Sequence, residues 1–247
     1  MTSSFENIGY EDFRRMAGDG SLSEQEKIGF PDSYRAGYEE AIFRDITNKL
    51  SNLNGNAKAV LDIGPGCAGL PRLLIDHSVA RGHSLVLLDS PEMLAQLPDA
   101  TGVRKIPGFY PDCEEALNPW AGKFDAILCY SVFHYIFTEA NFWKFLDYSL
   151  QLLAPGGQML IGDIPNVSKR KRLFASDAGI RFHQAFMRTS DKPHVDFRAV
   201  EINKIDDAVI LGVIMRARAQ GADAYWLPQP ATLPMANRRE DVLITKP

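Results

Sequence analysis

Apolar residues recur along the chain in two patterns that alternate from residue 57 onward. Short unbroken apolar runs indicate parallel strands that are buried on both faces, and stripes at helical spacing indicate amphipathic helices. The expected strands of this region are 57–63, 84–89, 103–108, 124–130 and 158–163. Helices are expected directly after the glycine-containing turn at 64–69, at 91–97 and at 138–157.

The helix expected at 138–157 has the clearest stripe in the chain. Thr138 is expected to cap its beginning, and APGG at 154–157 is expected to end it. The residues that share its apolar face are Phe142, Phe145, Leu146, Ser149, Leu150 and Leu153.

Both ends of the chain depart from this alternation. Residues 1–56 are polar and helical in character, and the stripe of their best helix is formed by Ile42, Ile46, Leu50 and Leu53. A later helix at 205–221 has Asp206 or Asp207 as its N-cap and Gly221 beyond its end. The strands expected at 223–228 and 240–246 have no helix between them, which predicts an antiparallel pair.

These elements predict an α/β fold with a doubly wound, Rossmann-like sheet. We expect four parts: an N-terminal helical cap at 1–56, a cofactor-binding core at 57–164, a basic lid insertion at 165–204, and a C-terminal part of the core at 205–247. In such sheets ligands bind beyond the carboxyl ends of the strands. The residues that end each strand are therefore the first candidates for function.

The turn after the first strand reads KAVLDIGPGCAGL, with a G-x-G-x-x-G formed by Gly64, Gly66 and Gly69. Glycines here let the backbone approach a ligand, and the following helix offers free N–H groups. Asp89 ends the next strand, 23 residues after Gly66. A carboxylate at that distance suits the hydroxyls of a ribose. The combination predicts a nucleoside-type cofactor, either a nicotinamide dinucleotide or S-adenosylmethionine.

Asp62 favours the second cofactor. A carboxylate beside the first glycine would repel a pyrophosphate but would attract an ammonium and a sulfonium cation. The reductase alternative also usually brings a Tyr-x-x-x-Lys relay, which the chain lacks.

Four motifs resemble those of the class I S-adenosylmethionine-dependent methyltransferases. They are VLDIGPGCAG, LVLLDSPEML, FDAILCYSVFHYI and LLAPGGQMLIGD, which lie between residues 57 and 164, whereas residues 205–247 are similar in topology only. The resemblance implies a seven-stranded sheet with an antiparallel last strand, S-adenosylmethionine as the cofactor, and methyl transfer as the reaction. More loosely, the chain is similar to methyltransferases of surface-polysaccharide biosynthesis, through IGFPDSYR and GDIPNVSKRKR.

The resemblance also assigns cofactor contacts. Asp62 and the glycine turn would lie against the methionine moiety, and Asp89 would bind the ribose hydroxyls. Ser90, Met93 and Tyr130 are further expected contacts. Many members carry an Asp after the third strand for the adenine amino group, whereas this chain has IPGFYPDC, so Phe109 or Asp112 takes that position.

Three residues at strand ends are candidates for catalysis. Tyr130 and His134 follow the fourth strand, where the methyl group would point, and His134 could take a proton from an acceptor hydroxyl. The alternative is a histidine that only packs. Asp163 ends the fifth strand and could orient the acceptor or act as the base; the alternative is a carboxylate that caps the next turn.

Residues 165–200 carry a net charge of +5 in a chain whose total is −4. A local basic segment on an acidic body suggests a localised anionic ligand, with a solvated surface as the alternative. Within it, FASDAGIRFHQAFM reads as an amphipathic helix that buries Ile180, Phe182 and Phe186. The candidates for contact with an acceptor, such as a sugar or nucleotide-linked sugar, are Lys169, Arg170, Arg172, Arg181 and His183.

The composition argues against several other classes of function. Three scattered cysteines and the absence of metal-ligand spacing predict neither a disulfide framework nor a metal site and fit a cytoplasmic protein. The acidic body predicts no nucleic-acid partner, and no apolar run long enough for a membrane span is found. A small-molecule acceptor is expected, and the oligomeric state is left open. A catalytically silent, cofactor-binding member is the remaining alternative.

Overall fold

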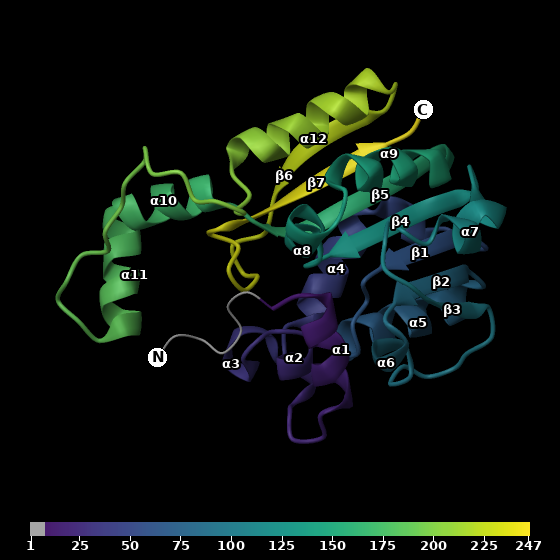
Figure 1. Cartoon of the computed structure of the whole chain (residues 1–247), viewed down its shortest axis with the longest axis horizontal. Helices are drawn as coiled ribbons and strands as arrows, with labels where there is room; N and C mark the ends of the chain where they lie inside the picture. Colours follow the sequence, from purple (N-terminus) through teal and green to yellow (C-terminus); the bar gives the residue numbers. More distant parts are fainter. Residues whose placement is uncertain (1–7) are drawn as a thin grey trace.

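A seven-stranded mixed sheet forms the centre of the computed structural model, which describes residues 8–247 (Figure 1). The strands lie in the order β3-β2-β1-β4-β5-β7-β6. Their bounds are β1 Ala59–Ile63, β2 Ser84–Asp89, β3 Val103–Pro107, β4 Phe124–Tyr130, β5 Leu153–Pro165, β6 Asp223–Pro228 and β7 Arg239–Thr245. The doubly wound fold predicted from the sequence is therefore confirmed.

The pairing of the strands explains the sequence pattern. Strands β1 to β5 pair in parallel, and β7 is antiparallel to both β5 and β6. The antiparallel terminal pair was expected because no helix separates the two segments. Strand β1 lies between β2 and β4, so the chain order reverses at this point of the sheet and opens a crevice at the carboxyl ends.

Helices cover the two faces of the sheet. On one face, α4 (Glu39–Lys49) and α5 (Gly69–Arg81) pack on Val60, Leu85 and Leu128. The predicted stripe of Ile42, Ile46, Leu50 and Leu53 is buried there. On the other face, helices α8 (Phe133–Glu139), α9 (Phe142–Leu152) and α12 (Asp207–Ala219) pack on alternate residues of the same strands. Successive side chains of a strand point to opposite faces of the sheet, so each strand contributes apolar residues to the cores on both faces.

Short helices fill the rest of the chain. Before the sheet lie α1 (Tyr10–Gly18), α2 (Glu24–Lys27), α3 (Asp32–Arg35) and the 3₁₀ turn η1 (Ser51–Asn54). Between strands lie α6 (Pro91–Leu94), α7 (Glu114–Leu117) and η2 (Asn118–Trp120). The helix predicted at 205–221 is α12, and Asp206 is its N-cap through a hydrogen bond from Val209 N to Oδ1.

The helix predicted at 138–157 is wrong at both ends. Helix α9 begins at Phe142, and the Asn141 side chain caps it by accepting a hydrogen bond from Lys144 N. Thr138 instead belongs to the separate helix α8 and bonds back to the carbonyls of His134 and Tyr135. The N-cap of this helix is therefore Asn141 and not the expected Thr138. The APGG segment is already part of β5.

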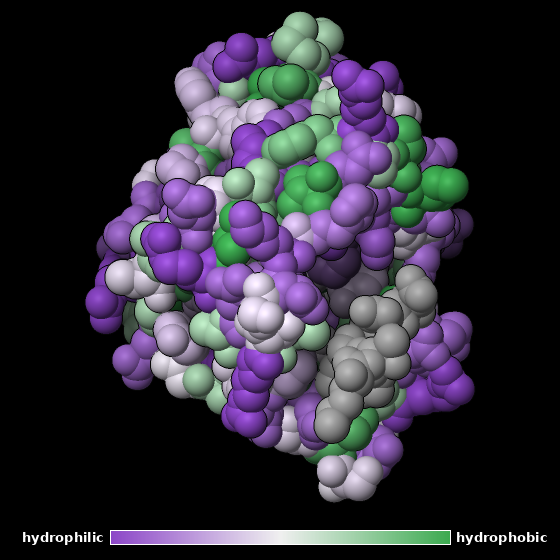
Figure 2. All heavy atoms as spheres, turned by 90° about the vertical axis from the view of Figure 1, so that its left-hand side faces the viewer, coloured by the Kyte–Doolittle hydropathy of each residue, from purple (hydrophilic) through white to green (hydrophobic). Residues whose placement is uncertain are grey.

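The basic insertion also differs from expectation. Its helices α10 (Val167–Ala175) and α11 (Asp177–Met187) project from the edge of the body (Figure 1), and Phe182 and Phe186 are exposed rather than buried. Figure 2 shows the face on which this segment lies, where apolar side chains reach the surface among polar ones. The basic residues of α10 are also not free for a ligand, because Lys169, Arg170 and Arg172 pair with carboxylates of the chain itself, at Glu240, Glu201 and Asp207.

No helix within residues 8–247 has the length and apolar character needed to cross a membrane.

A buried ion pair ties the N-terminal helices to the sheet. Lys49 of α4 donates to Asp45 and to Asp241 of β7, each at 2.6 Å, and Asp241 has no exposed surface. Lys49→Met leaves both buried carboxylates without their cation, so we expect the free energy of unfolding in urea to fall by about 3 kcal/mol. Lys123→Met, at an exposed lysine bonded only to a backbone carbonyl, is the control. Equal stability of the two variants would contradict the prediction.

Candidate functional site

A cavity opens between the N-terminal helices and the carboxyl ends of β1, β2 and β4. It encloses about 1000 Å³ of empty space, including the part open to solvent. Its floor is the glycine turn and the ends of the three strands, and its roof is formed by residues of α1, α2, α3 and the segments between them. The strand order therefore places the cavity at the reversal of the chain, as the sequence predicts.

Two positions of the glycine turn, 64 and 66, accept no residue other than glycine without strain. Gly64 and Gly66 both have φ of +69°, and both line the cavity. A Cβ atom would lie 2.6 Å from Val132 Cγ2 at residue 64 and 2.8 Å from Ile28 Cγ2 at residue 66. Gly69 begins α5 and is not itself a lining residue.

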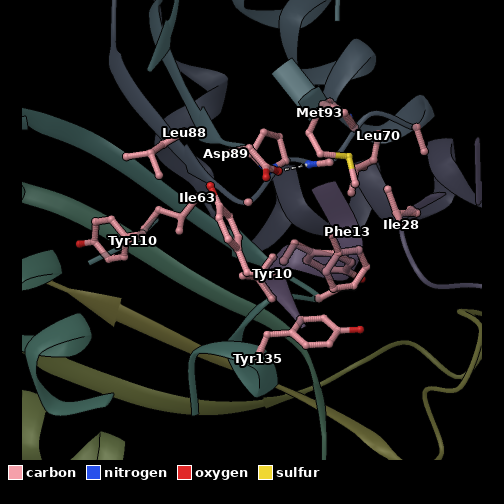
Figure 3. A pocket seen from close by; sticks show the side chains of 18 of the residues that line it. Tyr10, Phe13, Ile28, Ile63, Leu70, Leu88, Asp89, Met93, Tyr110 and Tyr135 are labelled. Atoms are coloured by element: carbon pink, nitrogen blue, oxygen red, sulfur yellow. Dashed lines mark hydrogen bonds between the residues drawn. The ribbon is translucent and has the colours of Figure 1, made fainter. Parts of the chain in front are cut away.

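Asp89 lies at the end of β2, between the turn and the cavity (Figure 3). Its carboxylate accepts hydrogen bonds from Gly66 N at 2.9 Å and Ser90 N at 2.7 Å. Burial raises the Asp89 pKa to about 6. Ser90 is fully buried and caps α6 through Met93 N, and Met93 lines the cavity. The carboxylate is thus held in place by the backbone, with acceptor capacity left for a ligand.

Asp62 is a buried carboxylate two residues before Gly64, the first glycine of the turn. Burial, and then repulsion from Asp89, raise its pKa to about 8. Within residues 8–247 its carboxylate accepts no hydrogen bond. A group with this environment is stabilised in its charged form by a ligand that brings a cation or a hydrogen-bond donor.

Aromatic side chains form the opposite wall of the cavity. Figure 3 shows Tyr10 and Phe13 of α1 beside Tyr135 of α8, across from Asp89. The Tyr10 ring meets Phe109 edge to face at 4.9 Å, and its hydroxyl donates to Gly108 O at 3.3 Å. Phe109 lines the cavity. Flat apolar surfaces of this kind suit the ring of a nucleoside.

Ser131, which lines the cavity, and Asp163 of the neighbouring strand β5 share an unusual backbone conformation. Ser131 follows β4 with φ of +63°, and Asp163 lies in β5 with φ of +57°. The Ser131 hydroxyl donates to Asp163 Oδ2 at 2.5 Å. Left-handed backbone costs of order 1–3 kcal/mol at a residue other than glycine and persists where the surroundings require it. Such residues cluster at functional sites, which marks this pair for attention.

Gly162 and Tyr130 are neighbours in the same strand pair. A Cβ atom at 162 would lie 2.3 Å from Cδ2 of the Tyr130 ring. The glycine therefore lets the ring lie flat across β5 and line the cavity. Burial raises the Tyr130 pKa well above its usual value, so the hydroxyl stays protonated.

His134 does not line the cavity. It lies on α8, and its Nδ1 atom is buried and has no hydrogen-bond partner within residues 8–247. Burial, and then the charge of Arg239, lower its pKa to about 3. The ring is therefore neutral at ordinary pH and is a weak base.

The basic residues predicted to contact an acceptor are also outside the lining. Lys169, Arg170 and Arg172 are ion-paired, as described above. Arg181 is exposed, and the His183 ring packs edge to face on Phe174 at 6.0 Å. The structure thus brings Gly64, Gly66, Asp89, Met93, Phe109 and Tyr130 together in the lining of one cavity, whereas Asp62 is buried in β1 outside this lining and the basic segment lies apart from it.

Sequence reasoning missed one charged residue of the cavity. Arg35 of α3 lines it and donates from Nη1 to Ser131 Oγ at 2.9 Å. Helix α3 has four residues, so it shows no periodicity that could point to the arginine. The only signal was its place in IGFPDSYR, a segment singled out for resemblance rather than for chemistry.

Comparison with known proteins supports a methyltransferase architecture. Residues 61–161 match the family model described as "Methyltransferase domain", which is less than half of the chain. This range contains the glycine turn, Asp89 and the end of β4. No curated protein sequence matches the chain.

Several solved structures share the fold at low sequence identity. The chain aligns with a complex of the Haloferax volcanii Trm112 methyltransferase activator and a putative methyltransferase, at 15% identity and a TM-score of 0.57, over 96% of this chain and 98% of the other. It aligns with the N-methyltransferase NodS from Bradyrhizobium japonicum, solved with S-adenosylhomocysteine, at 13% identity and a TM-score of 0.55, over 96% and 98%. A putative methyltransferase from Listeria monocytogenes gives 17% identity and a TM-score of 0.52, over 87% and 99%.

The raised pKa of Asp62 predicts a pH dependence in the ligand-free protein. The folded state holds the proton up to about pH 8, whereas the unfolded state loses it near the ordinary aspartate pKa of 3.8. Unfolding between these pH values therefore releases a proton, and the free energy of unfolding falls as the pH rises from about 4 to about 8. Asp62→Asn has no such proton to release, so its stability should change less over this range in urea titrations.

The same carboxyl should couple ligand binding to proton release. S-adenosylhomocysteine carries an ammonium group, which would favour ionised Asp62. Calorimetry at pH 7 in buffers of different ionisation enthalpy should show protons released by the wild type and fewer by Asp62→Asn. Identical proton release in both proteins would refute the assignment of the cation to Asp62.

Proposed function

We propose that this chain, an S-adenosylmethionine-dependent methyltransferase with S-adenosylmethionine as its cofactor, methylates a hydroxyl group of a small anionic acceptor. A sugar or a nucleotide-linked sugar is the favoured class, in line with the loose similarity to methyltransferases of surface-polysaccharide biosynthesis. The observation that carries the proposal is the hydrogen bond from Ser131, which lines the cavity beside the cationic Arg35, to Asp163 behind it.

The residues of the cavity fit this cofactor. Asp89 has acceptor capacity at the end of β2 for a ribose diol, and Asp62 is a buried carboxylate that lacks a donor within residues 8–247. Phe109 and Met93 offer apolar surface for the adenine, between the ribose site and α1. The turn at Gly64 leaves room for close approach of the ligand.

When bound, the cofactor supplies a methyl carbon that its sulfonium makes electrophilic. In-line displacement then requires little from the protein except alignment and the exclusion of water. The aromatic wall of Tyr10, Phe13 and Tyr135 and the roof of N-terminal helices supply that exclusion.

A hydroxyl acceptor must also lose its proton, and we assign this step to Asp163 through Ser131. The acceptor hydroxyl would pass its proton to Ser131 Oγ as the methyl group leaves the sulfonium sulfur for the acceptor oxygen. Ser131 at the same time gives its own proton to Asp163 Oδ2, 2.5 Å away. Arg35, which donates to Ser131 Oγ, holds the serine in this orientation.

This assignment replaces His134 and Tyr130 as bases. The pKa of His134 is lowered to about 3, so the ring takes protons poorly, and it does not line the cavity. The raised pKa of Tyr130 keeps that hydroxyl protonated, which suits packing under Arg35 rather than proton removal. We also leave the basic residues of α10 and α11 out of the proposed site, because three of them already have carboxylate partners.

Ligand binding separates the proposed function from the reductase alternative. We expect S-adenosylhomocysteine at saturation to raise the melting temperature by several degrees, because it binds the folded state alone. NADH should produce no shift at the same concentration. Stabilisation by NADH without stabilisation by S-adenosylhomocysteine would refute the proposal.

Two substitutions test the proton path. In assays of S-adenosylhomocysteine formation with UDP-sugars and CMP-linked sugars, Asp163→Asn and Ser131→Ala should each lower kcat by about 100-fold, the usual contribution of a positioned base. Affinity for S-adenosylhomocysteine should stay within twofold. Asp196→Asn and Ser21→Ala, at exposed loop positions, are the matched controls.

Ser131→Gly serves as a second variant at the strained position. It removes the hydroxyl but relieves the left-handed backbone at residue 131. A low kcat in both Ser131 variants with unchanged stability would support the path. Full activity of Ser131→Gly would remove the serine from it.

A further inference from the structure

Arg35 is a buried cation at the wall of the cavity. The residue is 5% exposed, and it lines the cavity together with Tyr130 and Ser131. It is the last residue of α3, the short helix that Pro31 precedes, so its backbone belongs to the N-terminal helices rather than to the sheet. The side chain therefore reaches from the roof of the cavity to the carboxyl end of β4.

Aromatic rings occupy the surroundings of the guanidinium. Its Cζ atom lies 4.8 Å from the centroid of the Phe30 ring and 5.4 Å from that of Tyr130. Rings stabilise a cation partly, but they accept none of its hydrogen bonds. The five N–H donors lie in the plane of the guanidinium, so a hydrogen-bonding partner must approach its edge.

Among the described residues, only one of those donors has a partner. Nη1 donates to Ser131 Oγ, a neutral hydroxyl, and no carboxylate oxygen of residues 8–247 lies within 4 Å of the group. Other arginines differ: Arg14 pairs with Glu92, Arg216 with Asp147, and Arg239 lies 3.6 Å from Asp163. A buried cation without a counter-ion is costly unless something else supplies the negative charge.

We propose that Arg35 binds an oxyanion, a carboxylate or a phosphate, of the molecule that occupies the cavity. The guanidinium would meet two oxygens of the anion edge-on, while Phe30 and Tyr130 hold its faces. Two sources share this chemistry: the acidic group of the acceptor and the carboxylate of the cofactor's methionine moiety. The contact with Ser131, whose hydroxyl bonds to Asp163, favours the acceptor, and this source alone depends on the proposed function.

The position of Arg35 would then decide which acceptors react. An acidic group held by Arg35 fixes a neighbouring hydroxyl beside Ser131, whereas a neutral analogue of the same size leaves the cation unpaired. Sites of this kind reject molecules that lack the paired group far better than an apolar pocket rejects a missing methylene. Arg35 would therefore select acidic acceptors over their neutral counterparts.

The first measurement compares the stability of ligand-free variants. Arg35→Met keeps the length and apolar stem of the side chain but removes the charge. If the cation is reserved for a ligand, the melting temperature should stay within about 2 °C of the wild type, because no ion pair is lost. Arg14→Met, at an arginine of the same cap that is paired with Glu92 and Glu11, is the control.

The second measurement locates the anion by calorimetry with two nucleosides. S-adenosylhomocysteine carries the amino-acid carboxylate, and 5′-methylthioadenosine lacks it. If Arg35 holds that carboxylate, Arg35→Met should weaken S-adenosylhomocysteine at least tenfold and leave 5′-methylthioadenosine unchanged. Arg35→Lys should recover part of the affinity, because it restores the charge but not the planar fork.

The third measurement tests the acceptor as the source. In protein saturated with S-adenosylhomocysteine, sodium acetate or phosphate should raise the wild-type melting temperature above that in sodium chloride of equal ionic strength. Arg35→Met should abolish this difference, and Arg14→Met should keep it. In activity assays, the preference for UDP-glucuronate over UDP-glucose should fall at least tenfold in Arg35→Met.

The outcomes separate the two proposals. Loss of S-adenosylhomocysteine affinity, or loss of the anion effect, supports Arg35 as the oxyanion site and names its source. A lower melting temperature of ligand-free Arg35→Met with no change in any ligand effect would overturn it, because the arginine would then be structural. Failure of the wild type to bind either nucleoside would instead refute the proposed function, whatever Arg35 does.

Discussion

The reversal of chain order between β1 and β4 is the constraint on which the site depends. The chain leaves β1 toward β2 and β3 and returns on the other side of β1 to form β4, so the helices that follow the two inner strands lie on opposite faces of the sheet. Their separation leaves the carboxyl ends of β1, β2 and β4 uncovered. Residues that are far apart in sequence, such as Gly64, Asp89 and Ser131, come to one cavity for this reason.

The N-terminal helices turn that open crevice into an enclosed cavity. They are anchored at both sides of it: Arg14 of α1 pairs with Glu92 of α6, and Lys49 of α4 pairs with Asp241 of β7. Enclosure has an electrostatic consequence, because removal of water raises the pKa of Asp62 and Asp89. The same roof thus shapes the cavity and increases the response of its carboxylates to a bound cation.

The sequence predicted the sheet well and the cavity in part. Strand positions and the turn at Gly64 and Gly66 follow from local patterns, since apolar runs and glycine conformations act within a few residues. The break between α8 and α9 was missed because one apolar stripe crosses it, and only the cap at Asn141 shows the new start. Arg35 could not be found in this way, since its contact with Ser131 spans 96 positions and depends on a four-residue helix.

The distribution of charge explains why selection of an acceptor would depend on one side chain. The chain has a net charge of −4, and the basic residues Lys169, Arg170 and Arg172, which most suggest an anion site, are neutralised by Glu240, Glu201 and Asp207. The surface therefore offers an anion little long-range attraction. The carboxylates of Asp62 and Asp89 near the glycine turn suit a cationic ligand, and Arg35, the one cationic residue in the described lining of the cavity, lies toward β4. On the function proposed above, this separation would order the two ligands along the sheet, with the positive group near the glycine turn and the negative group beside Ser131. Opposite charges in one enclosed space attract strongly, so each ligand would favour the binding of the other.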